Sequence, residues 1–358
     1  MIFTLRWFGP EDPVSLPALR QVPGLDGVVS ALPDLPAGAV WTPGAIEARR
    51  AELAEHGFAW TVAESLPVSE AIKLGGEQRD EHVAAWCASL RNLSDAGIRT
   101  VCYNFMPVFD WIRTDFAKQL PDGSNAMAYA HAELARFDFS RGMERLAAWA
   151  QGYSGEEVAE LFERARELGE ERLFAHLIGF LEEVVPVAEA SGVRLALHPD
   201  DPPWPIFGLP RIVHDRAGIE RILEAVDSPA NGLTFCTGAL GAEVGNDLAA
   251  MASAFAPRVA FVHARNVRRT GERDFHEVAH HPSAGDVDLL AVLERLVAAG
   301  VDVPLRPDHG RMLWGERAIP GYGLFDRCIG LAYLQGIVAA LERREGRPRP
   351  AASEPARH

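Results

Sequence analysis

Short apolar and β-branched runs recur along the chain, and segments with helical periodicity separate them. Eight of these runs predict strands, at residues 3–9, 27–32, 58–65, 98–105, 193–198, 232–238, 258–265 and 303–308. Helices are expected near residues 42–57, 77–97, 172–191, 217–226, 245–256, 286–300 and 325–344. The strands alternate with helices, which predicts an α/β fold, a (β/α)8 or TIM barrel.

An open doubly wound sheet is the alternative arrangement of such elements. That fold usually carries a glycine-rich nucleotide turn after its first strand. Here the first strand is followed by GPEDP, which offers no phosphate cradle. The barrel is therefore the preferred fold.

One interval between strands is much longer than the others. Residues 106–171 separate the fourth strand from the fifth, and much of this stretch is charged and helical in pattern. We expect a helical insertion over the barrel mouth, as a lid or an oligomer contact. Residues 1–343 are then a single catalytic domain, and the proline-rich tail 344–358 is expected to be disordered.

The composition narrows the class of protein. Apolar residues make up 48% and charged residues 24% of the chain, as in soluble globular proteins. The 35 basic and 50 acidic residues give a net charge of −15, which disfavours nucleic acid as a partner. We see neither a signal peptide nor a membrane-spanning apolar run, and expect a cytoplasmic homo-oligomer with a small-molecule substrate. The four cysteines are scattered without a C-x-x-C pair, so neither a disulfide framework nor a zinc ribbon is indicated.

Four successive predicted strands end in residues that can bind a divalent metal. His198, Cys236, His263 and Asp308 follow the fifth to eighth strands. Neighbouring strands lie about 4.8 Å apart, so these side chains can converge at the C-terminal mouth of the barrel. A thiolate with two imidazoles and a carboxylate suits a transition metal better than magnesium or calcium. Open coordination positions there would indicate catalysis.

A second histidine pattern occurs in HEVAH, residues 276–280, which matches the zinc-peptidase motif H-E-x-x-H. That motif needs a sustained helix, and the flanking RRTGERDF and HPSAG leave room for at most two turns. We expect a loop after the seventh strand instead. His276 or His280 could still contact substrate from such a loop.

Several long blocks carry a family resemblance. They are RWFGPEDPVSLPALRQVPG, ESLPVSEAIKLG, VCYNFMPVFDWIRTD, HPDDPPWPIFGLPRI, CTGALGA, FVHARNV, RPDHGRMLWGE and PGYGL. Together they resemble the mannonate dehydratase family of hexuronate degradation over about residues 1–340. The resemblance implies the same barrel, dehydration of D-mannonate to 2-keto-3-deoxy-D-gluconate, and a divalent Mn²⁺ or Fe²⁺. It assigns the metal ligands to the same four residues, and acid–base roles to His309 and Tyr322.

One block departs from the family pattern. The family block often reads PVHEDIK, whereas this chain has PVSEAIK, with Ser69 and Ala71. Any substrate contact of that histidine is in doubt here, although Lys73 is retained. A non-catalytic sugar-acid binder is therefore kept as an alternative, beside a metal-dependent sugar isomerase.

The dehydration needs one base and one acid. We hypothesise that His309 removes the C2 proton and that Tyr322 protonates the departing C3 hydroxyl. Asp308 and His309 are adjacent, so both can face the mouth only if the chain bends there, which Gly310 allows.

The HPDDPPWPIFGLP segment, residues 198–210, is rigid because it contains five prolines. Its two aspartates could contact sugar hydroxyls or His198, or cap the turn. The predicted substrate-binding residues are Arg306, Arg265, Lys73, Asp200, Asp201 and His276.

Overall fold

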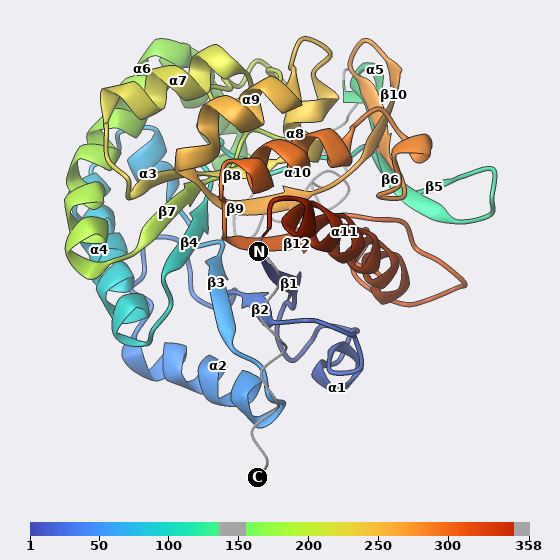
Figure 1. The fold of residues 1–358 in the computed structure, drawn as a ribbon. Helices are drawn as coiled ribbons and strands as arrows, with labels where there is room; N and C mark the ends of the chain where they lie inside the picture. The colour runs from blue at the N-terminus through green and yellow to red at the C-terminus, as the bar shows by residue number, and fades with distance from the viewer. Residues whose placement is uncertain (135, 137–154, 347–358) are drawn as a thin grey trace.

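A closed barrel of parallel strands forms the centre of the protein. The computed structural model describes residues 1–134, 136 and 155–346 (Figure 1). The barrel strands are β1 (Ile2–Arg6), β2 (Gly27–Ser30), β3 (Trp60–Glu64), β4 (Thr100–Tyr103), β7 (Arg194–Leu197), β8 (Asn231–Cys236), β9 (Val259–Ala264) and β12 (Pro304–Pro307). They close in the order β1-β12-β9-β8-β7-β4-β3-β2, so all eight predicted strands and the TIM-barrel prediction are confirmed.

Helices cover the outside of the barrel, as Figure 1 shows. The helices are α1 (Leu16–Leu19), α2 (Pro43–Glu55), α3 (Glu70–Lys73), α4 (Arg79–Asp95), α5 (His131–Leu134), α6 (Gly155–Ser191), α7 (Arg216–Ala225), α8 (Thr237–Ala242), α9 (Leu248–Phe255), α10 (Leu289–Ala298) and α11 (Leu324–Arg344), with 3₁₀ turns at Ala256–Arg258 and Pro282–Ala284. Of these, α5 lies away from the barrel, at the upper right of Figure 1. Each helix expected from the sequence is present. The helix α6 starts earlier than predicted and bends at Gly169, whose φ is +70°.

Side chains that cap the first turn mark several helix starts. Asp215 accepts a hydrogen bond from the Gly218 backbone N–H before α7, and Asp288 accepts one from Ala291 before α10. Such caps satisfy backbone donors that have no partner within the helix. They fix where each helix leaves its loop.

Alternating side chains build two apolar layers. A small cluster, Val29, Val62, Cys102, Ala196, Ala260 and Phe261, has members on five barrel strands. Their chain neighbours, such as Val28 and Val101, belong to the larger core that includes the helices. The small cluster fills the barrel interior, so the barrel is a packed core rather than a pore.

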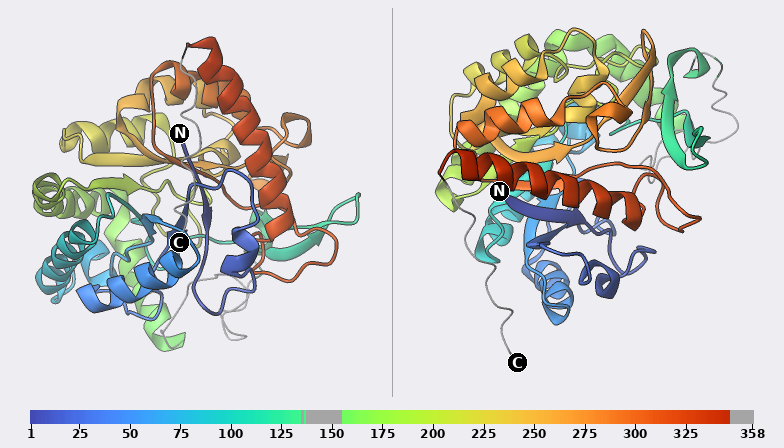
Figure 2. Two further views of the ribbon diagram at one scale, coloured as in Figure 1. Left: turned by 60° about the horizontal axis from the view of Figure 1, so that its bottom comes forward. Right: turned by 45° about the vertical axis from the view of Figure 1, so that its right-hand side comes forward.

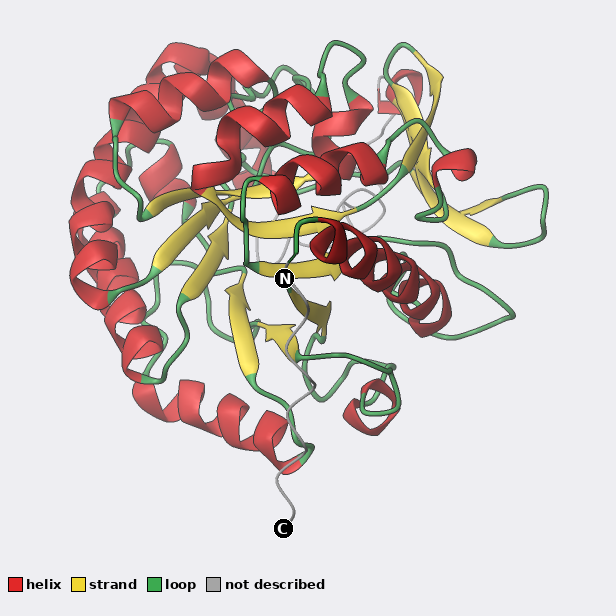
Figure 3. Ribbon diagram, viewed as in Figure 1, coloured by secondary structure: helices red, strands yellow, loops and turns green. Residues whose placement is uncertain are grey.

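A second sheet stands beside the barrel, with the strand order β10-β11-β6-β5 (Figure 3). We call it the accessory sheet: β5 (Asp115–Gln119), β6 (Asn125–Ala130), β10 (Val267–Gly271) and β11 (Asp274–Glu277). The expected helical insertion is therefore wrong for its first half, which is a β-hairpin. The signal was present, because Asp122 and Gly123 are typical hairpin-turn residues and the Leu120 N–H donates to the Ser124 carbonyl at 2.8 Å.

The last helix, α11, packs against α10, β12 and β1. Both views of Figure 2 show it beside β1. By length and mean hydropathy it is the one helix among the described residues that could cross a membrane, although the sequence showed no sufficiently long apolar run. Its contacts bury Leu331, Leu334, Val338 and Leu341, whereas Phe325 and Ile329 are exposed. Most of the predicted disordered tail, from residue 347 on, lies outside the described residues.

Gly232 in β8 tests how tightly the barrel is packed. A Cβ there would lie 2.6 Å from the Leu195 carbonyl oxygen and 2.9 Å from that of Arg258, and backbone atoms give way least. We expect Gly232→Ala to lower the free energy of unfolding by about 1–3 kcal/mol, measured by chemical denaturation. Gly44→Ala is the control, because nothing lies within 4 Å of its Cβ position and it should be neutral or slightly stabilising. Equal stability of the two variants would contradict this packing.

Candidate active site

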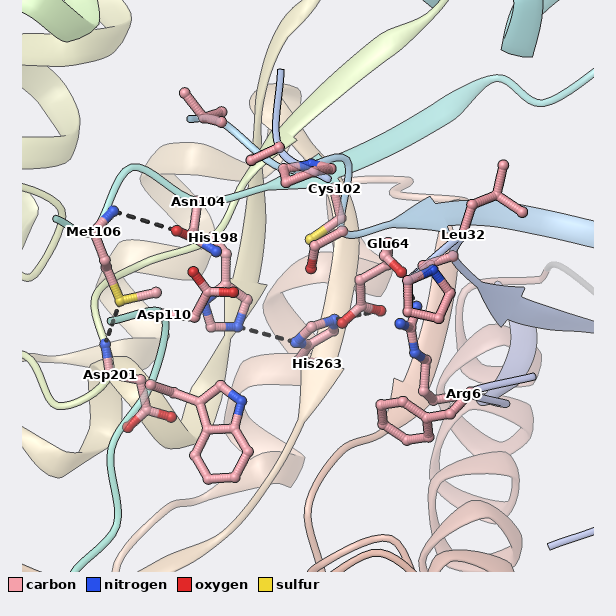
Figure 4. Close-up of a pocket in the computed structure, with 18 of the residues that line it drawn as sticks. Arg6, Leu32, Glu64, Cys102, Asn104, Met106, Asp110, His198, Asp201 and His263 are labelled. Atoms are coloured by element: carbon pink, nitrogen blue, oxygen red, sulfur yellow. Dashed lines mark hydrogen bonds and ion pairs between the residues drawn. The ribbon is translucent and has the colours of Figure 1, made fainter. Parts of the chain in front are cut away.

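A cavity of about 420 Å³ opens at the C-terminal ends of the barrel strands. Of the predicted site residues, nine line it: His198, His263, Asp308, His309, Tyr322, Arg265, Arg306, Asp201 and Lys73. Figure 4 shows part of the wall, with His198 and His263 side by side and Glu64 on the far side of His263. The volume is in the range of small-molecule sites.

The strand register brings the predicted metal ligands together. Cys236 of β8 pairs with His263 of β9, and His263 pairs with Arg306 of β12. Ligand atoms of His198, Cys236 and His263 lie within 4.8 Å of one another. Asp308 completes the group, with its Oδ2 atom 3.8 Å from the Cys236 Sγ and 3.9 Å from the His263 Nδ1.

These distances fit a transition metal. Ligand atoms about 2.0–2.3 Å from a common tetrahedral centre stand roughly 3.3–3.8 Å apart. The His198 Nε2 and His263 Nδ1 atoms are 3.2 Å apart, close to that spacing. The His198 Nδ1 atom is 2.7 Å from the Pro199 carbonyl, to which it can donate, and this leaves the Nε2 lone pair for a metal. Burial lowers the pKa of His198, which favours the neutral imidazole that metal binding requires.

Asp308 is held by a neighbouring arginine. The Arg306 Nη1 atom lies 2.7 Å from the Asp308 Oδ1, while Oδ2 faces the thiol and imidazole. Burial favours the neutral form of Asp308, but Arg306 and the other positive groups around it together outweigh burial and hold the pKa of Asp308 well below its usual range. The carboxylate is therefore ionised and oriented toward the other ligands.

His309 and Tyr322 form a direct pair beside these ligands. The His309 Nε2 and Tyr322 hydroxyl are 2.9 Å apart, and Phe8 packs edge-on against the Tyr322 ring at 4.7 Å. Burial raises the pKa of Tyr322, although Arg306 acts in the opposite direction, so Tyr322 remains a phenol. The chain leaves β12 at Pro307, and this lets both Asp308 and His309 reach the cavity, as expected.

A buried charge network supports the other side of His309. Its Nδ1 atom lies 3.0 Å from the Arg265 Nη1 and 3.3 Å from the Glu277 Oε1. Asp201 joins this network by pairing with Arg265 at 2.8 Å and with Arg113 at 2.9 and 3.0 Å. Arg113 also donates to Glu277 at 2.8 Å. All five side chains are almost fully buried.

Ionisation of the two acids in this network follows from their arginine partners. Burial favours the neutral form of Glu277, but Arg265 and Arg113 outweigh it and lower the pKa of Glu277 to about 2. Arg113 and Arg265 likewise outweigh burial at Asp201 and hold its pKa well below the ordinary range. Both are therefore carboxylates near neutral pH.

The two aspartates of the proline-rich loop have different places. The Asp200 Oδ2 accepts from the Val213 backbone N–H at 2.7 Å, so it closes the loop and does not line the cavity. Asp201 lines the cavity and binds two arginines. Of the alternatives left open by the sequence, the turn-capping one describes Asp200.

Lys73 and Ser69 lie on another part of the wall. The Lys73 Nζ atom contacts the Glu70 Oε1 at 2.9 Å, and Ser69, Glu70 and Lys73 all line the cavity. The Ser69 hydroxyl lies 2.7 Å from the His82 Nδ1.

Only the first two residues of HEVAH belong to a strand, while residues 278–280 form a loop, as expected, and the segment contains no helical turn. His276 and Glu277 are the last residues of β11 in the accessory sheet. His276 pairs across the sheet with Arg268 and Ala128, and neither it nor His280 lines the cavity. The peptidase geometry is therefore absent from this segment, as expected.

Sequence reasoning missed four buried charged residues at this site: Arg6, Glu64, Arg113 and Glu277. Arg6 and Glu64 end their barrel strands, so the strand-end rule that found the metal ligands applies to them too. Glu277 was considered only as part of a peptidase motif. Arg113 lies in the long insertion, where no sequence pattern marked it.

The fold and site together define a TIM-barrel enzyme with a directly contacting histidine–tyrosine pair beside a cluster of side chains that could hold a metal. The family model described as D-mannonate dehydratase (UxuA) matches residues 1–347. The chain belongs to this family.

Individual relatives agree. Mannonate dehydratase 2 of Halalkalibacterium halodurans is 46% identical over 343 residues, which cover 95% of this chain and 99% of the relative. Mannonate dehydratase of Thermotoga maritima is 44% identical over 358 residues, covering 97% and 99%. The crystal structure of mannonate dehydratase from Streptococcus suis serotype 2 superposes with a TM-score of 0.92 at 40% identity, covering 100% of this chain and 99% of that one.

The different placement of Asp200 and Asp201 predicts different phenotypes. Asp201→Asn should lower the free energy of unfolding by about 3–5 kcal/mol, because Arg113 and Arg265 lose a buried counter-charge. It should also lower kcat by about 10–100-fold by displacing Arg265 from His309. Denaturation and steady-state kinetics measure the two effects.

Asp200→Asn is the matched control, since an asparagine oxygen can still accept from Val213. We expect it to retain kcat within about threefold. Equal loss of kcat in both variants would refute the distinction between the two positions.

Proposed function

We propose that this protein is a metal-dependent hydro-lyase that removes water from D-mannonate to give 2-keto-3-deoxy-D-gluconate. The observation that carries the proposal is the His309–Tyr322 pair, 2.9 Å apart and beside four metal-competent side chains. Family membership over residues 1–347 supports the same substrate. The reaction belongs to hexuronate catabolism.

The charges around the cavity support a divalent metal and a monoanionic substrate. Four buried arginines and four buried carboxylates meet here: Arg6, Arg113, Arg265, Arg306, Glu64, Asp201, Glu277 and Asp308. These eight charges cancel, Lys73 pairs with Glu70, and Asp110 adds one further carboxylate to the lining. A divalent ion, the Cys236 thiolate and one substrate carboxylate would then add no net charge, which a buried site requires. Mn²⁺ or Fe²⁺ suits the mixed sulfur, nitrogen and oxygen donors.

His198, Cys236, His263 and Asp308 would hold this ion. When bound, it would supply a Lewis acid for the substrate carboxylate and so stabilise the negative charge that develops on loss of the C2 proton. Arg265 and Arg306 add fixed positive charge to the same wall.

The acid–base pair accounts for the bonds that change. His309 takes the C2 proton at Nε2, the C–H electron pair forms the C2–C3 double bond, and the C3–O bond breaks. Tyr322 donates its phenolic proton to the leaving hydroxyl, which departs as water. The enol product then becomes the 2-keto acid. Direct contact between the two side chains gives a path by which the proton on His309 returns to Tyr322.

Glu277 and Arg265 prepare His309 for this role. If the His309 Nδ1 carries its proton, it donates to Glu277, and Nε2 is left as the acceptor that a base needs. Arg265 lies 3.0 Å from the same Nδ1 atom and pairs with Glu277 at 3.5 Å, so it helps to hold the carboxylate beside His309.

Cytoplasmic location and homo-oligomeric assembly stay predictions. Four free cysteines are consistent with a reducing compartment. Cell fractionation and light scattering test the two predictions.

A product assay tests the proposed reaction. Protein loaded with Mn²⁺, Fe²⁺ or Co²⁺ and incubated with D-mannonate should yield a 2-keto-3-deoxy acid, detected by mass spectrometry as loss of one water. Metal-free protein is the control and should yield none. An aldose–ketose interconversion would indicate the isomerase instead, and binding without any product would indicate the non-catalytic sugar-acid binder.

Tyr322→Phe tests the acid. Removing the phenolic proton donor should lower kcat by about 10²–10⁴-fold, while the metal content per chain stays that of the unsubstituted protein. Steady-state kinetics and elemental analysis measure the two quantities. Unchanged kcat would remove Tyr322 from the acid role.

A further inference from the structure

Two overlapping groups of metal-competent side chains share His263. One consists of His198, Cys236 and His263, and the other of Glu64, Cys102 and His263. The ring of His263 has two nitrogens, and each faces a different group. The role of the second group therefore depends on which His263 nitrogen faces Glu64 and Cys102.

The two nitrogens have distinct surroundings. Nδ1 lies 3.2 Å from the His198 Nε2 and 3.9 Å from the Asp308 Oδ2. Nε2 lies 3.7 Å from the Glu64 Oε2. Among the described residues neither Nε2 nor that oxygen has a hydrogen-bond partner, and both atoms are buried. Two buried polar atoms that face each other without another partner are costly unless they interact.

A second metal ion is a poor explanation for the Glu64 group. The other carboxylate oxygen of Glu64 lies 2.9 Å from the Arg306 Nη2, and the Arg6 guanidinium donates to the Glu64 backbone carbonyl. Two guanidinium groups beside the site would repel another cation. Cys102 already contacts the Thr234 hydroxyl at 3.3 Å.

We propose that Glu64 is a positioning residue that accepts a hydrogen bond from the His263 Nε2–H and thereby turns the Nδ1 lone pair toward the metal. This proposal rests on the proposed metal-dependent function. The gap of 3.7 Å has to close by about 0.7 Å to reach an ordinary N–H···O distance. Carboxylates that accept from the second nitrogen of a ligand histidine fix its tautomer and raise its basicity.

Arg306 connects Glu64 to a second predicted metal ligand, Asp308. Its Nη2 holds the Glu64 Oε1, and its Nη1 lies 2.7 Å from the Asp308 Oδ1. One guanidinium therefore orients the carboxylate behind His263 and the carboxylate that faces the metal. Arg306, which is also predicted to contact substrate, lines the cavity and makes both of these ion pairs.

The test is a metal titration without substrate, so a failure of the dehydration reaction cannot affect it. Metal-free full-length protein is titrated with Co²⁺ against a chromophoric chelator, and the visible spectrum reports the thiolate and the ligand geometry. The unsubstituted protein should bind one Co²⁺ per chain. Glu64→Ala should keep that stoichiometry and the thiolate charge-transfer band, with affinity lowered about 10–100-fold and altered d–d bands.

Three further variants make the result specific. Glu64→Gln keeps an acceptor oxygen and should lose less affinity than Glu64→Ala. Cys102→Ala should bind like the unsubstituted protein. Glu277→Gln is the matched control, because Glu277 is also a buried carboxylate but faces His309 rather than a predicted metal ligand. The Co²⁺ affinity of this variant should change by less than about threefold.

Several results would overturn the proposal. Unchanged Co²⁺ affinity in Glu64→Ala is one. A second bound ion that is lost in both Glu64→Ala and Cys102→Ala would make Glu64 a ligand instead. If circular dichroism shows that Glu64→Ala does not fold, the test is made with Glu64→Gln. A Co²⁺ affinity lowered about threefold or more would then support the proposal, and an unchanged affinity would contradict it. Absence of Co²⁺ binding by the unsubstituted protein would overturn both this proposal and the metal-dependent function.

Discussion

Pairing of buried arginines with buried carboxylates is the constraint on which the active site depends. A charge removed from water is tolerated only when an opposite charge and hydrogen bonds replace the solvent. Asp201, Arg113, Arg265 and Glu277 satisfy this condition together, and no two of them come from the same segment. The network therefore forms only when the barrel strands, the proline-rich loop and the accessory sheet are all in place. We interpret its value as fixed geometry, because buried ion pairs of this kind often contribute little to stability.

The same principle explains how one wall can serve two kinds of chemistry. At the predicted metal site, Arg306 pairs with the carboxylates of Glu64 and Asp308 and so fixes their orientation. At the neighbouring histidine–tyrosine pair, Arg265 and Glu277 contact His309 and hold it against Tyr322. The predicted metal ligands and His309 are thus each held in position by buried charged side chains, which do not need to contact the substrate themselves. Preorganisation of this type keeps the reorganisation that accompanies the reaction small.

The barrel and its metal-competent side chains were predictable because both follow from local pattern. Strands of alternating or apolar residues ended in His198, Cys236 and His263, and parallel strands place such ends at one mouth. The accessory sheet was harder to predict from the sequence. Its strand β5 is short and half exposed, and its strand β6 pairs with β11, which lies more than 140 residues further along the chain. Glu277 could not be placed without that pairing. The charge network in turn needs contacts between segments far apart in sequence, which no local periodicity encodes.

The accessory sheet shares no strand pairing with the barrel. Its strands β5 and β6 belong to the long insertion, and β10 and β11 follow β9, so separating them breaks no barrel pairing. Structural units of this size often open with a free energy lower than that of global unfolding. Each opening would carry Glu277 away from His309 while the predicted metal ligands stay on their strands. On heating, the protein would then lose catalytic activity at a lower temperature than the one at which it loses the ability to bind a metal.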